Sequence, residues 1–159
     1  MKVTIEFIDH NRQLAKFYII AFFIATFILF AFMLAQANEI NLEIIAKIES
    51  SNNPLAYNTR SQARGLYQIT PICLKDYNQQ NGLNLPVNAL FNPSTSHTIA
   101  KWYLEARIPL ILQNKGIPVT VDTVLWAYNA GVGKVIKGIM PNETRNYIKK
   151  YKQLARRAK

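Results

Sequence analysis

Glu49 is the residue whose position in this sequence most favours acid–base chemistry. It ends a stretch in which isoleucines recur at helical spacing, at positions 40, 44, 45 and 48, so one face of the predicted helix is buried. The turn-forming residues Ser50 to Pro54 follow directly and place Glu49 in the last turn. The helix dipole and apolar surroundings both raise the carboxyl pKa, as a general acid near neutral pH requires. An ordinary surface glutamate at a helix end is the alternative interpretation.

Three motifs follow this segment in order. They are Ala63-Arg64-Gly65-Leu66-Tyr67-Gln68-Ile69-Thr70-Pro71, Ala127-Tyr128-Asn129-Ala130-Gly131 and Glu143-Thr144-Arg145-Asn146-Tyr147-Ile148. Together with Glu49-Ser50 and Asn53-Pro54, the set covers about residues 40 to 150 and resembles the soluble-lytic-transglycosylase-like (SLT) catalytic domain. The resemblance implies a mainly α fold of the α+β lysozyme-like superfamily. It also implies an enzyme that cleaves the glycan strands of peptidoglycan.

The resemblance implies that one glutamate, Glu49, acts first as acid and then as base. Most glycoside hydrolases use a second carboxylate, and no other acidic residue is an evident partner of Glu49 by its place in the sequence. In the family, the 6-hydroxyl of N-acetylmuramic acid (MurNAc) instead attacks its own anomeric carbon. The β-1,4 bond to N-acetylglucosamine (GlcNAc) then breaks, and a 1,6-anhydro sugar results.

The resemblance also names five substrate-binding residues around this acid. Ser50 is expected to be its hydrogen-bonding neighbour, and Gln68 to hold the substrate beside it. Tyr128 and Asn129 are expected to line the opposite side, and Glu143 to position or tune the site. Each type of residue has a structural alternative: a backbone cap for the serine, a buried loop bond for the glutamine, the core for the tyrosine and a helix start for the second glutamate.

Two readings other than a lytic transglycosylase remain open. A muramidase on the same fold would hydrolyse the same bond with water. A wall-binding component of a secretion, conjugation, pilus or phage machine would keep the fold with marginal turnover. Tyr67 and Thr70 stand where family members often carry Met, so the glycan preference is also open.

Residues 17–35 form an uncharged apolar run that, at about 1.5 Å per residue, could span roughly 28 Å of bilayer. Lys2, Arg12 and Lys16 precede it, so residues 1–16 are expected to remain in the cytoplasm. Ala35-Gln36-Ala37 fits a signal-peptide cleavage site. Residues 17–37 are therefore either an inner-membrane anchor or a signal segment cleaved near Ala37, with a buried core helix as the alternative. The domain at 38–159 is expected in the periplasm or cell envelope.

Basic residues dominate this domain, with 16 Lys and Arg against 7 Asp and Glu from residue 38 onward. This charge favours an anionic partner such as a cell-wall polymer or lipid headgroups. Nucleic acid is disfavoured as a partner, because the domain is expected to be exported and the sequence has no recognisable nucleic-acid-binding motif. For most of the basic residues near the end of the chain, a solvated helix face is the alternative interpretation. Seven basic residues follow Glu143: Arg145, Lys149, Lys150, Lys152, Arg156, Arg157 and Lys159.

The remaining pattern predicts helices and no cofactor. Helices are expected at about 39–50, from Pro71 to about 81, at 93–115 with a kink or break at Pro109, up to 129, and from 142 onward. In the last of these, Tyr147, Ile148, Tyr151 and Leu154 form an apolar stripe. Thr70 and Thr120 are the candidate N-caps, while Gly131 and Gly133 are expected to end helical structure or to allow a close backbone approach. Cys73, the only cysteine, is expected in the core. The two histidines, His10 and His97, stand alone, so no metal site is expected.

Overall fold

The computed structural model of this protein describes residue 16, residues 18–28 and residues 40–158. Residues 18–28 are helical and belong to a different compact unit from the domain that begins at Ile40. No helix within the described ranges is both long enough and apolar enough to cross a membrane. The predicted membrane or signal segment at 17–37 lies partly outside the described residues.

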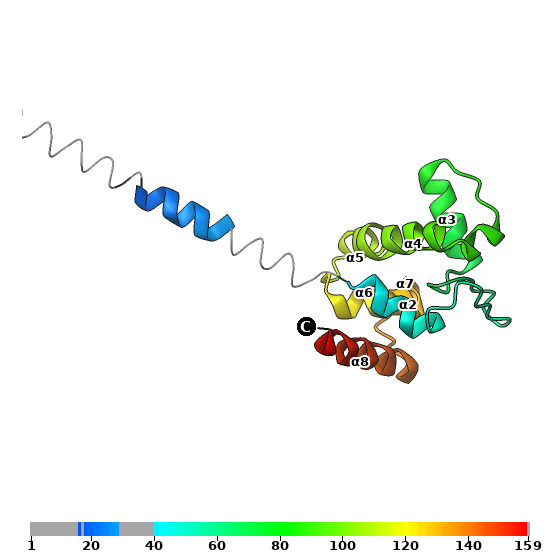
Figure 1. Ribbon diagram of the computed structural model, residues 1–159. Helices are drawn as coiled ribbons and strands as arrows, with labels where there is room; N and C mark the ends of the chain where they lie inside the picture. Colours follow the sequence, from blue (N-terminus) through cyan, green and yellow to red (C-terminus); the bar gives the residue numbers. More distant parts are fainter. Residues whose placement is uncertain (1–15, 17, 29–39, 159) are drawn as a thin grey trace, which may run out of the picture. The chain divides into compact units, whose positions relative to one another are not determined.

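The domain from residue 40 to 158 is built from helices (Figure 1). In this range the structure contains no extended strand, and two isolated bridges, Tyr57 with Arg64 and Arg64 with Ile69, order the loop between the first two helices. A 3-10 turn, η1 (Val87–Phe91), and a π-helical turn, η2 (Tyr103–Arg107), complete it. The α-helices are α2 (Leu42–Ser50), α3 (Pro71–Asn81), α4 (Pro93–Trp102), α5 (Ile108–Asn114), α6 (Val121–Ala130), α7 (Val132–Ile136) and α8 (Asn142–Arg157).

Polar caps start most of the longer helices. Thr70 and Thr120 accept hydrogen bonds from the amides of Cys73 and Thr123, which confirms both predicted N-caps. Asn41 caps α2 in the same way. Gly82, with φ +64°, ends α3 close to the predicted place. Local sequence therefore sets these helix limits.

The predicted 93–115 helix is divided near Pro109. Within η2 the amide of Ile108 donates to the carbonyl of Tyr103, a five-residue step in place of the usual four. The break follows because Pro109 has no N–H and its ring crowds the preceding turn. One expectation was wrong: Gly133 lies inside α7, while Gly131, with φ +86°, alone separates α6 from α7.

The core of the domain lies around α6, which contacts α5, α7 and α8. Leu125 and Ala127 of α6 are fully buried. On α8, Tyr147, Ile148 and Tyr151 face this core, as the predicted apolar stripe requires. Cys73 is buried in the same core, which confirms its prediction. In Figure 1, α8 lies on one side of α2 and α6, with α3 and α4 on the other.

Candidate active site

Glu49 lies in the last turn of α2, as its sequence context predicts. Ser51 follows in the left-handed conformation, with φ +54°, and Asn52 repeats it with φ +64°. The chain therefore turns away directly after Glu49. The glutamate side chain is left half-buried between α2 and the elements packed on it.

Burial raises the pKa of the Glu49 carboxyl to about 7, from an ordinary value of 4.5. The negative charge of Glu143 raises it further, whereas the hydroxyl of Tyr147 and the charge of Lys150 act in the opposite direction. All three modifying residues belong to α8, so the packing of α8 against α2 sets the final value. A carboxyl with this pKa can both donate and accept a proton near neutral pH.

Tyr147 is a site residue that the sequence analysis assigned only to the apolar stripe. Its buried hydroxyl lowers the pKa of the Glu49 carboxyl and has no hydrogen-bond partner of good geometry among the described residues. Burial and the charge of Glu49 both raise the tyrosine pKa, so the hydroxyl keeps its proton and is available to donate a hydrogen bond to the carboxylate. The signal was present, because Tyr147 lies in the third motif, but its helical position looked purely apolar.

Tyr128 reaches the same site from α6. Its hydroxyl donates to the backbone carbonyl of Tyr67 at 2.6 Å, and its ring lies 6.0 Å from that of Tyr103. Burial, followed by the charge of Glu49, raises the pKa of Tyr128. The structure thus brings Tyr128 close to the acid and also anchors it in the core.

Ser50 and Gln68 hold the loop that follows α2. The Ser50 hydroxyl lies 2.9 Å from the carbonyl of Leu66 and 3.1 Å from that of Ala46, and donates to one at a time. The Gln68 amide donates to the carbonyls of Ala56 and Gly65 at 3.2 and 3.1 Å. These bonds match the structural alternatives for both residues, and their contact with substrate stays a prediction.

Asn129 and Glu143 lie where α6 and α8 meet. Asn129 accepts a 2.7 Å hydrogen bond from the buried Thr144 hydroxyl. The bond ties the end of α6 to the first turn of α8. Glu143 is exposed in that turn and close enough for its charge to act on Glu49. Thr144, which the sequence analysis did not select, therefore positions the start of α8.

An open hollow of about 610 Å³ lies between α2, the following loop and the end of α8. The loop residues Leu66 and Tyr67 line it, and they are the same two whose carbonyls bind Ser50 and Tyr128. Lys47 and Arg157 add positive charge to its wall, and Glu43 adds negative charge. Apolar and aromatic walls with a few charged groups suit a sugar polymer that carries anionic groups.

The described part of the chain contains no group of three or more His, Cys, Asp and Glu side chains that could hold a metal ion. The raised pKa of Glu49 suits proton transfer at this site. Tyr147, Tyr128 and the exposed Glu143 are all close enough to interact electrostatically with this carboxyl.

The model of the transglycosylase SLT domain family matches residues 32–151. The chain therefore belongs to the SLT transglycosylase family, which confirms the resemblance seen in its motifs. The helical domain accordingly has the lysozyme-like fold of this family, and peptidoglycan cleavage of the lytic transglycosylase type follows at the level of the family. Neither the curated proteins nor the solved structures gave a match.

Proposed function

We propose that this protein is a lytic transglycosylase in which Glu49 is the single acid/base for cleavage of the MurNAc–GlcNAc β-1,4 bond. The observation that carries the proposal is the half-buried Glu49 carboxyl with a pKa of about 7 beside the Tyr147 hydroxyl. At pH 7 about half of the molecules then hold the proton that the leaving oxygen needs. Burial near an apolar core keeps competing water away.

The reaction balances with this one carboxyl. Glu49 gives its proton to the glycosidic oxygen, and the bond from that oxygen to the MurNAc anomeric carbon breaks. The 6-hydroxyl oxygen of the same sugar bonds to the anomeric carbon, and its proton returns to the Glu49 carboxylate. The products are a free GlcNAc 4-hydroxyl and a 1,6-anhydroMurNAc end, and no water is consumed.

Tyr147 and the loop residues have supporting roles in this proposal. Donation from the Tyr147 hydroxyl stabilises the carboxylate formed after proton transfer. Ser50 and Gln68 hold the loop whose Leu66 and Tyr67 line the hollow. In this proposal the glycan strand passes Glu49 beside this loop, with Tyr128 and Asn129 on the side of α6, since none of these three residues lines the hollow itself.

Hydrolysis by a muramidase is the second candidate, and one observation favours it. Glu143 is near enough to act on Glu49 electrostatically, and two carboxylates are the usual equipment of a hydrolase. In that case Glu143 would activate water. Its neutral analogue, Glu143→Gln, would then stop cleavage, whereas in a transglycosylase it only lowers the pKa of Glu49.

The test compares Glu49→Gln with Glu105→Gln on purified walls. Glu105 of η2 forms an exposed ion pair with Lys101 of α4. The Glu105 variant therefore controls for the loss of a carboxylate away from the site. Loss of the acid should lower lysis roughly 100-fold or more, and mass spectrometry of the wild-type digest should show anhydro ends. Reducing ends would establish the muramidase, and lysis by the Glu49 variant at a tenth of the wild-type rate would remove Glu49 from its role.

The location of the enzyme belongs to the same proposal. The cations before residue 17 and the apolar run of residues 17–35 support a location of the domain in the periplasm or cell envelope, anchored in the inner membrane or released by cleavage near Ala37. Service to a secretion, conjugation, pilus or phage machine is compatible with this location. Detection of residues 1–37 in the mature protein by mass spectrometry would distinguish an anchor from a cleaved signal.

A further inference from the structure

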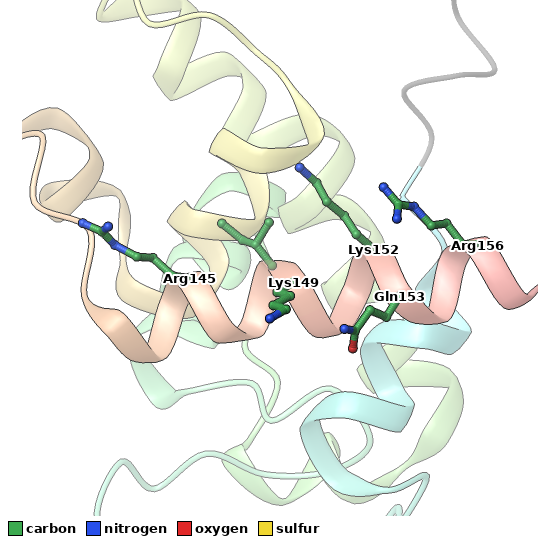
Figure 2. A pocket seen from close by; sticks show the side chains of 6 residues that line it. Arg145, Lys149, Lys152, Gln153 and Arg156 are labelled. Atoms are coloured by element: carbon green, nitrogen blue, oxygen red, sulfur yellow. The ribbon is translucent and has the colours of Figure 1, made fainter.

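The basic residues of α8 divide into two sets in the structure. Arg145, Lys149, Lys152 and Arg156 follow one another at intervals of four, three and four residues, so they lie along one side of the helix. We call these four residues the cationic stripe. Figure 2 shows them in succession along α8, where they line an open hollow of about 310 Å³ together with Ile148 and Gln153.

The second set faces the active site. Lys150 lowers the pKa of Glu49, and Arg157 lines the larger hollow beside Tyr67. At about 100° per residue, Lys149 lies roughly 160° around the helix from Tyr147, whose hydroxyl meets Glu49. The cationic stripe is therefore a separate surface, on the side of α8 away from the acid. Both sets belong to the single run of basic residues that follows Glu143 in the sequence.

The cationic stripe carries charge that the described part of the protein does not neutralise. Lys152 pairs with Asp122 of α6 at 2.6 Å. No carboxylate of the described residues forms an ion pair with Arg145, Lys149 or Arg156, which are all exposed. The stripe extends over roughly 16 Å of helix. Like charges at this spacing repel one another within a helix, and an external anion relieves that repulsion.

The chemistry of α8 favours a polymer over a bilayer as that anion. A helix that lies in a membrane surface needs an apolar side to insert, but the apolar side of α8 is buried in the core. None of the described large apolar residues that are exposed belongs to α8. A row of Arg and Lys instead suits carboxylates presented along a chain, with which both side chains form charge-assisted hydrogen bonds.

We propose that the cationic stripe docks the carboxylates of peptidoglycan peptide side chains, on a strand other than the one held at Glu49. The proposal rests on the proposed function, from which it takes the polymer. Docking to one strand raises the effective concentration of its neighbours at the active site. The stripe thus acts on binding to the wall mesh and leaves the chemical step unchanged.

The test measures binding to purified walls by sedimentation, with the full chain in neutral detergent and Glu49→Gln present so that the walls stay intact. The stripe variant is Lys149→Gln with Arg156→Gln. The matched control is Lys75→Gln with Lys115→Gln, which removes the same charge from exposed residues of α3 and the end of α5. Lys152 is kept because of its pair with Asp122, and Arg145 because it belongs to the third motif.

The stripe variant should bind walls at least about fivefold more weakly, and the control less than about twofold. Amidation of the wall carboxylates should weaken wall binding by the protein with the unaltered stripe to the level of the stripe variant. Equal losses in both variants, or binding that ignores amidation, would overturn the proposal. The proposal would also be overturned if the stripe variant bound phosphatidylglycerol micelles more weakly than the unaltered protein but bound walls equally well. Because the background is inactive, these outcomes do not depend on whether cleavage yields anhydro ends.

Discussion

Glu49 couples the chemistry of the site to the stability of the fold. Burial raises its pKa to about 7 in the folded protein, whereas its ordinary value is 4.5. Below pH 4.5 the group is protonated in both states and has no effect on stability. As the pH rises through this interval, the unfolded state ionises first, and the folded state loses stability relative to it. The general acid is thus maintained at the expense of stability at neutral and higher pH.

Glu49→Gln should therefore stabilise the protein in a pH-dependent way. The substitution removes an ionisation that is unfavourable in the folded state, so at pH 8 we expect a gain of up to about 3 kcal/mol. At pH 4 the gain should be close to zero, because the carboxyl is then neutral. Urea unfolding of wild type and variant at pH 8 and pH 4 measures the two gains in the free energy of unfolding. A gain of the same size at pH 4 would attribute the effect to packing.

Tyr147→Phe should shift the pH dependence of cleavage upward. The change removes the hydroxyl that stabilises the Glu49 carboxylate, so the pKa of the acid rises and activity persists to higher pH. The rate should also fall, because the carboxylate formed after proton transfer loses its donor.

Tyr151→Phe is the matched control for this prediction. Tyr151 also lies on α8, but its hydroxyl accepts a hydrogen bond from the amide of Asn41 at 2.7 Å. Its loss should lower stability and leave the pH profile in place. Coincident profiles for wild type and the Tyr147 variant would show that this tyrosine has only a packing role.

Among the elements, the loop between α2 and α3 and the helix α8 form the site together. The loop is held by the hydroxyl of Ser50 and by Tyr128. Helix α8 supplies the three residues that adjust the pKa of Glu49 beyond the effect of burial. Disturbance of either element is expected to affect activity before the remaining core is lost.

Gly65→Ala should test how closely this loop packs. Gly65 has φ +76°, and a Cβ atom there would come within 2.0 Å of the Leu90 carbonyl oxygen. Backbone strain and this overlap should together cost about 3 kcal/mol or more in the free energy of unfolding. Gly82→Ala shares the positive φ but meets nothing within 4 Å, so about 1 kcal/mol is expected there. Similar losses in urea unfolding would mean that the close approach to Leu90 has no effect.

For the whole molecule, the domain from Ile40 onward has its own core. Its buried residues come from α2 through α8. All the motif segments lie after residue 48. We therefore propose that segment 1–37 serves membrane targeting.

Removal of residues 1–37 should leave a folded and active domain. The helical circular dichroism of residues 38–159 and their lysis of purified walls measure the two properties. Comparison with the full chain in detergent, on the same walls, provides the control. A fragment that fails to fold would indicate that the apolar run belongs to the core.

Much of the site could be predicted because it depends on local sequence. The isoleucine spacing and the turn residues after Ser50 place Glu49 at a helix end, since helix limits depend on neighbouring residues. Thr70 and Thr120 define helix starts for the same reason. The ordered motifs identified the family, because each keeps its residues within a few positions of one another.

The tertiary structure alone decided which side chains meet the acid. Tyr147 looks apolar from its helical position, and only the packing of α8 on α2 turns its hydroxyl toward Glu49. Lys149 and Lys150 are adjacent in the sequence, yet one belongs to the cationic stripe and the other acts on the acid. Neighbours on a helix diverge by about 100°. Their environments therefore depend on elements distant in the chain, whose placement comes from burial of the common core.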